Sequence, residues 1–163
     1  MTNINKYELL PEGLKDLLQE EAAKETIAER SFLDHLETYG YKIIKPPIME
    51  YEENLLSGML FSEKKDSFRL MDTQSKRLMT LRSDITPQIA RIASTRLENY
   101  PRPLRLIYSG EVLRNDNKNI IPDRQFKQIG AELFGAPLIA GLLEVISATV
   151  ESLNKLNLNN LSI

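Results

Sequence analysis

The stretch LRSDITPQIARIA, residues 81–93, decides how the rest of the chain is interpreted. Its apolar start predicts the end of a strand, and isoleucines then recur at helical spacing. Thr86 and Pro87 predict the helix start, because threonine can cap free amides and proline is favoured in the first turn. Arg82, Asp84 and Thr86 therefore gather at a strand-to-helix junction, which suggests a small-ligand site.

The composition favours a single globular domain over residues 1–163. Hydrophobic residues make up 42% of the chain and charged residues 27%, enough to bury one core. The formal net charge of −2 gives no general basic field for nucleic acid or membrane. The absence of cysteine excludes disulfides, thiolate nucleophiles and cysteine-ligated metals. No signal peptide or spanning helix is readable, so we expect a cytoplasmic protein with no membrane partner.

Helical and strand-forming segments alternate in the first half of the chain. The turn in LLPEGLKDLL is expected to lead into a short helix, and residues 20–39 form a longer one. YKIIKPPIMEY, residues 41–51, is interpreted as a strand whose two prolines confine it to a sheet edge or an interface. SFRLMD and RLMTL predict a hairpin.

Two longer strands, over 104–114 and 125–134, and an amphipathic helix over 137–156 complete the pattern. Short turns between strands, with helices interspersed, predict an α/β (α+β) fold with a mostly antiparallel sheet flanked by helices. The final residues, NLSI, have the character of the start of another strand. We therefore expect the sheet to be incomplete in this chain, and the chain to be a piece of a longer protein.

Alternation along the two long strands predicts a polar cleft. Gln128, Gly130 and Glu132 share one face of their strand, while Gly110 and Arg114 share a face of the other, together with Tyr108. A glycine on each face leaves room beside charged groups. If the two faces coincide, they form the floor of the cleft.

The residue types indicate what such a cleft could bind. Arg114 could bind a phosphate or carboxylate bidentately. Asp84 and Glu132 could accept hydrogen bonds from an ammonium group, with Thr86 and Gln128 fixing the ligand's orientation. This chemistry suits an amino acid or a nucleotide.

Simpler interpretations remain open for several residues. Asp84 can be only a helix-start residue, and the glycines can mark bulges. His35, the only histidine, is expected at the surface near a helix C-terminus, and no metal site is expected. Lys118, Arg124 and Lys127 form a basic patch that is expected to be solvated. The alternative is that they contact a phosphate. In that case Arg124 is a second candidate anion-binding residue, in addition to Arg114.

Six motifs resemble, in the same order, the catalytic core of the class II histidyl-tRNA synthetases. They are LLPEGLKDLL, the long helix ending in YGY, the PPIMEY strand, LRSDITPQIARIA, YSGEVLRND and RQFKQIGAELFG. The resemblance implies a class II synthetase-like fold and a homodimer interface built from the helix and strand within 20–50. It places Arg114 where the family binds ATP phosphate. It assigns the histidine-binding positions to Asp84, Thr86, Gln128 and Glu132.

The departures from the synthetase pattern point away from catalysis. Synthetases typically have LRPEGT where this chain has LRSDIT, so Ser83, Asp84 and Ile85 replace proline, glutamate and glycine. Asn115 follows Arg114 at the position where synthetases carry an aromatic residue, and Lys127 replaces the histidine of RQFHQ. A shorter acid and a bulky isoleucine are expected to weaken an adenylate-forming site.

The same motifs, LRSDITPQIARIA followed by VLR and QIGAELFG, resemble the regulatory subunits of ATP phosphoribosyltransferase. That resemblance implies a non-catalytic protein without a cofactor or tRNA. Its partner would be the short catalytic subunit in the first step of histidine biosynthesis, where histidine inhibits the complex. Histidine could bind in the inherited pocket or at the subunit junction. The alternatives are a fragment of an active histidyl-tRNA synthetase and a class II-like domain with an unrelated binding role.

Overall fold

Two small sheets and the helices around them make up the fold in this computed structural model, which describes residues 10–55, 67–115 and 123–158. The strands are β1 (Lys42–Ile43), β2 (Met49–Tyr51), β3 (Arg69–Met71), β4 (Leu78–Leu81), β5 (Leu104–Leu113) and β6 (Gln125–Phe134). The helices are α1 (Gln19–Thr38), α2 (Glu52–Leu55), α4 (Thr86–Ser94) and α5 (Leu138–Lys155). The expected long helices, the hairpin and the two long strands are confirmed.

The sheets are mostly antiparallel, as the sequence predicts. The first has the order β1-β5-β6, with β1 parallel to β5 and β5 antiparallel to β6. The second has the order β2-β4-β3 and is antiparallel throughout. Pro46 and Pro47 separate β1 from β2, and both of these strands lie at sheet edges. The edge location predicted from the prolines is therefore confirmed, although the single expected strand is split between two sheets.

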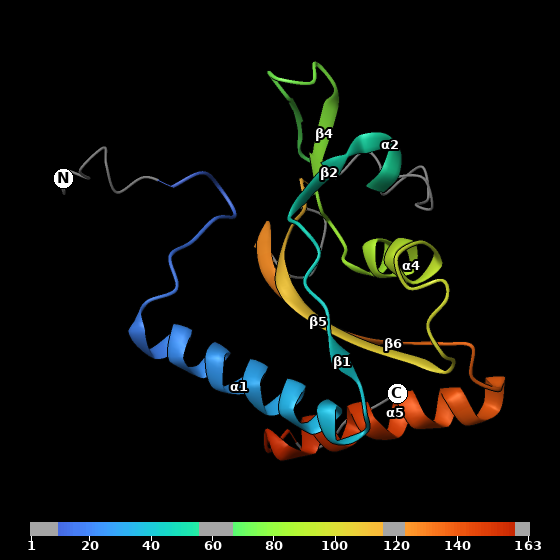
Figure 1. The fold of residues 1–163 in the computed structure, drawn as a ribbon. Helices are drawn as coiled ribbons and strands as arrows, with labels where there is room; N and C mark the ends of the chain where they lie inside the picture. The colour runs from blue at the N-terminus through green and yellow to red at the C-terminus, as the bar shows by residue number, and fades with distance from the viewer. Residues whose placement is uncertain (1–9, 56–66, 116–122, 159–163) are drawn as a thin grey trace.

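Helices cover both faces of the first sheet. Figure 1 shows α1 and α5 side by side beneath it, with α4 on the other side. Phe32 and Leu36 of α1 pack with Ile107 of β5 and Ala148 of α5 in one core. The other core joins buried residues of α4 and its preceding turn to β5: Ile85, Ile89, Ala93, Leu106, Tyr108 and Val112. The first half of α5 is less buried, since Leu138 is 85% exposed.

Three expectations about local structure have different outcomes. The short helix predicted after the first turn is wrong, because residues 14–18 form no regular element and Leu18 is 67% exposed. The strand start predicted for NLSI lies outside the described residues. Within the described ranges, no helix is long and apolar enough to cross a membrane.

His35 is buried rather than at the surface. Its exposed fraction is 8%, and its ring meets the Tyr39 ring edge-on at a centroid distance of 5.5 Å. The His35 Nε2 atom lies 3.3 Å from a carboxylate oxygen of Glu151 on α5. The surface prediction failed because it considered only the position of His35 near the end of α1. It could not include the covering helix α5.

A bidentate ion pair connects the first sheet to α5. The Nε and Nη2 atoms of Arg105 donate to the two carboxylate oxygens of Glu144 at 2.6 and 2.7 Å. Both side chains are more than two-thirds buried. These hydrogen bonds from Arg105 hold the pKa of Glu144 below its ordinary value.

The Arg82 guanidinium connects β5, the segment between β1 and β2, and α4. It is 6% exposed, and it donates from Nε to the carbonyl of Glu111 at 2.7 Å and from Nη1 to the carbonyl of Pro46 at 3.0 Å. Its Nη1 also lies 3.5 Å from the Gln88 side-chain oxygen. The planar guanidinium can satisfy several acceptors held by separate segments. Arg82 is thus a structural residue at the junction and not an open ligand contact.

We expect Arg82→Ala to reduce the free energy of unfolding by about 3 kcal/mol or more, because it leaves the Glu111 and Pro46 carbonyls and the Gln88 side-chain oxygen without this donor. Arg82→Lys should lose a similar amount, since an ammonium group cannot reproduce the fork of donors. Urea denaturation followed by circular dichroism measures both. Arg96→Ala, at an exposed position, is the control and should be nearly neutral. A loss below about 1 kcal/mol for Arg82→Ala would contradict this role.

Glu144→Gln should destabilise the protein by about 1 kcal/mol at neutral pH and by progressively less in acid. The folded-state pKa of Glu144 is lowered, so its contribution is present above the unfolded-state pKa. That contribution is lost as the pH falls through the folded-state value. Denaturation series at several pH values should therefore converge for the wild type and the variant in acid. A gap that stays constant with pH would show that the ion pair is not responsible.

Candidate ligand-binding site

The polar faces of β5 and β6 coincide, as strand alternation predicts. The register pairs Gly110 with Gln128, Tyr108 with Gly130 and Leu106 with Glu132. Ten consecutive residue pairs join the two strands, so neither glycine marks a bulge. The turn that carries Asp84 and Thr86 hydrogen-bonds to side chains on this same face. The structure therefore brings together all four residues expected to form the amino-acid pocket.

Asp84 orients Gln128 at one end of this face. The Gln128 amide nitrogen donates to Oδ1 of Asp84 at 2.7 Å, and the backbone N–H of Ile85 donates to the Gln128 side-chain oxygen at 2.9 Å. Oδ1 of Asp84 also accepts from the backbone N–H of Thr86 at 3.1 Å. Asp84 is thus a helix-start residue and a side-chain acceptor at once. The helix-start interpretation is supported, and the ligand-binding interpretation of Asp84 stays a prediction.

Tyr108 connects Thr86 to Glu132 at the other end. Its hydroxyl lies 2.9 Å from the Thr86 hydroxyl and donates to Oε1 of Glu132 at 3.3 Å. Burial raises the pKa of Tyr108 to about 12, so this hydroxyl stays protonated at neutral pH. Sequence reasoning placed Tyr108 on the correct face but did not include it among the site residues. Its position two residues before Gly110 on that face was the available signal.

The surroundings of Glu132 affect its ionisation. Burial raises the pKa of Glu132, and the nearby negative charge of Asp84 raises it further. Hydrogen bonds with the Thr86 and Tyr108 hydroxyls act in the opposite direction. A partly buried carboxylate held in this way is suited to a cationic ligand group, which would replace the water it has lost.

The two glycines do not leave open space for a ligand. A Cβ atom on Gly130 would overlap the hydroxyl end of Tyr108, and one on Gly110 would overlap the Arg82 guanidinium. Protein side chains therefore occupy the room that the sequence assigned to a cleft. The prediction that the glycines leave an open floor is wrong. The Tyr108 side chain occupies the space beside Gly130, and the polar groups lie around it.

Arg114 and Arg124 lie together at the end of the β5–β6 pair where the chain connects the two strands, and the backbone N–H of Arg114 donates to the carbonyl of Arg124 at 2.8 Å. Nε of Arg114 donates to the Ser83 carbonyl at 3.2 Å, and its guanidinium lies 5.0 Å from the centre of the Phe126 ring. Nη2 of Arg124 donates to Oδ1 of Asn115 at 2.5 Å. Both candidate anion contacts are thus engaged with protein acceptors.

Lys127 is ion-paired and does not form a solvated patch with Arg124. Its ammonium lies 2.9 Å from Glu29 and 3.0 Å from Glu25, both on α1. Burial tends to lower the pKa of Lys127, but hydrogen bonds to these two carboxylates outweigh it and raise the pKa. The prediction of a solvated side chain is therefore wrong for Lys127. The third member of the patch, Lys118, lies outside the described residues.

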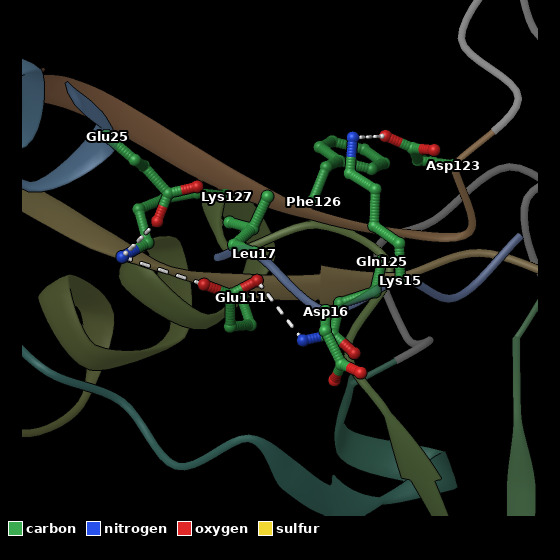
Figure 2. A pocket seen from close by; sticks show the side chains of 9 residues that line it. All are labelled: Lys15, Asp16, Leu17, Glu25, Glu111, Asp123, Gln125, Phe126 and Lys127. Atoms are coloured by element: carbon green, nitrogen blue, oxygen red, sulfur yellow. Dashed lines mark hydrogen bonds and ion pairs between the residues drawn. The ribbon is translucent and has the colours of Figure 1, made fainter. Parts of the chain in front are cut away.

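A pocket of about 300 Å³ lies beside this ion pair, as Figure 2 shows. The segment before α1 contributes Lys15, which forms a 2.8 Å ion pair with Asp123, another residue that lines the pocket. Glu111 and Lys127 from the sheet line it as well. The cations of this pocket are already paired with its acids. In the described part of the chain, no cluster of three or more acids and histidines could hold a metal ion.

Gly130→Ala tests whether Tyr108 fills the floor of the site. We expect a loss of about 1–3 kcal/mol in unfolding free energy, because the added methyl would overlap the tyrosine ring. Most of that loss should disappear in a Tyr108→Leu background, where the overlapping atoms are absent. A double-mutant cycle by urea denaturation measures the coupling. Equal losses in the two backgrounds would contradict the assigned contact.

Comparisons with known proteins agree on the family. Residues 13–163 match the profile described as histidyl-tRNA synthetase. The ATP phosphoribosyltransferase regulatory subunit of Paramagnetospirillum magneticum is 43% identical over 162 residues, covering 99% of this chain and 43% of that protein. The regulatory subunit of Geobacter sulfurreducens is 38% identical, covering 100% of this chain and 37% of its own length. The chain thus spans about two-fifths of the curated relatives it matches.

Solved structures show the same relationship. A Bacillus halodurans structure described as an ATP phosphoribosyltransferase regulatory subunit/histidyl-tRNA synthetase superposes with a TM-score of 0.83 at 27% identity, covering 98% of this chain and 40% of that chain. Apo histidyl-tRNA synthetase from Staphylococcus aureus gives a TM-score of 0.69 at 26% identity, covering 88% and 34% of the two chains. The fold is therefore class II synthetase-like, as expected. The chain belongs to the histidyl-tRNA synthetase family, and its curated relatives named above are regulatory subunits of ATP phosphoribosyltransferase.

Proposed function

We propose that this chain is part of a cytoplasmic, non-catalytic regulatory subunit of ATP phosphoribosyltransferase. The observation that carries the proposal is its 38–43% identity, over 99–100% of its length, to proteins with that name. In this role it assembles with the short catalytic subunit, which condenses ATP with phosphoribosyl pyrophosphate in the first step of histidine biosynthesis. The subunit conveys inhibition by histidine to that partner.

The face shared by β5 and β6 is the proposed histidine site. Asp84 and Glu132 supply two carboxylates, each able to accept more hydrogen bonds than it receives from the protein. One would receive the ammonium group of the amino acid and the other the imidazole N–H. Thr86 and Gln128, already oriented by their neighbours, would fix the position of the ligand.

Local features of the junction support the absence of catalysis. Ile85, at the position where the synthetases carry glycine, is fully buried in the α4 core. Asp84, a shorter acid than glutamate, is held by Gln128 and by the Thr86 amide. Arg114 donates to the Ser83 carbonyl and lies over Phe126. These contacts favour a junction in which the arginine is already held by protein groups.

The proposed subunit is a homodimer that associates through the helix and strand within 20–50. Apolar side chains on this segment support the proposal, since Ile27 is 67% exposed on α1 and Ile43 is 43% exposed on β1. Ile48, just before β2, is 42% exposed. Covering exposed apolar surface of this kind is the main source of stability in a dimer. tRNA has no part in this function.

The decisive experiment compares two activities of the full-length protein. We expect it to give no histidine-dependent exchange of pyrophosphate into ATP, and to raise the activity of a short-form ATP phosphoribosyltransferase that is weakly active alone. The catalytic subunit alone and an active histidyl-tRNA synthetase serve as controls. Robust exchange would instead identify a synthetase. A protein that shows neither activity would have an unrelated binding role.

A further inference from the structure

Tyr108 occupies a position in the site that none of the expected ligand-binding residues accounts for. It is 2% exposed, and its ring lies over Gly130, between Gln128 and Glu132 on the neighbouring strand. If Tyr108 served only to fill this space, the ring without its hydroxyl would be sufficient. The hydroxyl, however, lies within hydrogen-bond distance of both Thr86 and Glu132.

We propose that Tyr108 is a positioning residue that fixes the Glu132 carboxylate and the Thr86 hydroxyl so that Glu132 receives a cationic nitrogen of the bound ligand. This inference rests on the proposed histidine-binding function and extends it to a residue of the sheet floor. The tyrosine hydroxyl donates to one carboxylate oxygen, and the lone pairs that remain on Glu132 are directed to the ligand. The ligand class is an amino acid with a protonated amine or an imidazole.

The charge surroundings of Glu132 support the same role. The groups acting on it are the Tyr108 hydroxyl of β5, the Thr86 hydroxyl of α4 and the Asp84 carboxylate in the turn before α4. Burial and Asp84 raise the pKa of Glu132, while the two hydroxyls lower it. Without the Tyr108 hydroxyl, the pKa should therefore rise further. As the pH is lowered, a cation bound to ionised Glu132 should then dissociate at a higher pH than it does in the wild type.

Tyr108→Phe keeps the ring and removes only the hydroxyl. Tyr41→Phe is the matched control, because Tyr41 is also fully buried and packs in the core on the other face of the sheet. In calorimetric titrations of the full-length protein with histidine, Tyr108→Phe should weaken binding roughly tenfold, the expected cost of a hydrogen bond to a charged group. Tyr41→Phe should stay within about twofold of the wild type.

A second measurement separates positioning from simple packing. Carbon-13 NMR of labelled glutamate carboxyl groups follows the titration of Glu132 without ligand, and Tyr108→Phe should move its midpoint upward. The pH at which histidine binding is lost should move upward with it. An unchanged midpoint, or unchanged histidine affinity in a wild type that binds, would overturn the role of Tyr108. A shifted midpoint in a protein that does not bind histidine would support the positioning of Glu132 and refute the proposed ligand.

Discussion

The rest of this structure depends on the hydrogen bonds that the buried Arg82 guanidinium donates. It joins the end of β5, through the Glu111 carbonyl, to the Pro46 carbonyl between the two sheets. The backbone carbonyl of Arg82 also accepts a hydrogen bond from the N–H of Leu113 at 3.0 Å. Because Gly110 has no side chain, the guanidinium can lie directly against β5. The turn that follows Arg82 is thereby held over the sheet, and Asp84 and Thr86 are positioned at the site as a result.

Sequence periodicity predicted the elements of this fold well, because long amphipathic and alternating segments depend on local spacing. The α5 helix and the β5–β6 pair are the clearest cases, and the two prolines placed β1 and β2 at sheet edges. Errors arose where distant segments decide the outcome. His35 is covered by α5, and Lys127 is paired with α1, which no local pattern reveals. Residues 14–18 have helical composition, but most of them are exposed, so little packing is available to stabilise a short helix there.

The candidate site was predictable in its membership but not in its shape. Alternation placed Gln128 and Glu132 on one face, and the register confirms that this face meets Tyr108 and the turn at Asp84. The role of the glycines was misjudged, since only side-chain coordinates show what fills the space beside them. Tyr108 fills it at Gly130. Acids, an amide and hydroxyls thus share one face of the sheet, which suits recognition of an amino acid.

A crystal structure of the full-length protein grown with histidine tests most directly whether this face is an amino-acid pocket. We expect histidine to lie over β5 and β6, with either its ammonium group or its imidazole N–H at Glu132 and the other of these two groups near Asp84 and Gln128. Arg82 should keep its contacts to the Glu111 and Pro46 carbonyls. Histidine bound only elsewhere on the protein, with the β5–β6 face empty, would contradict the proposed site.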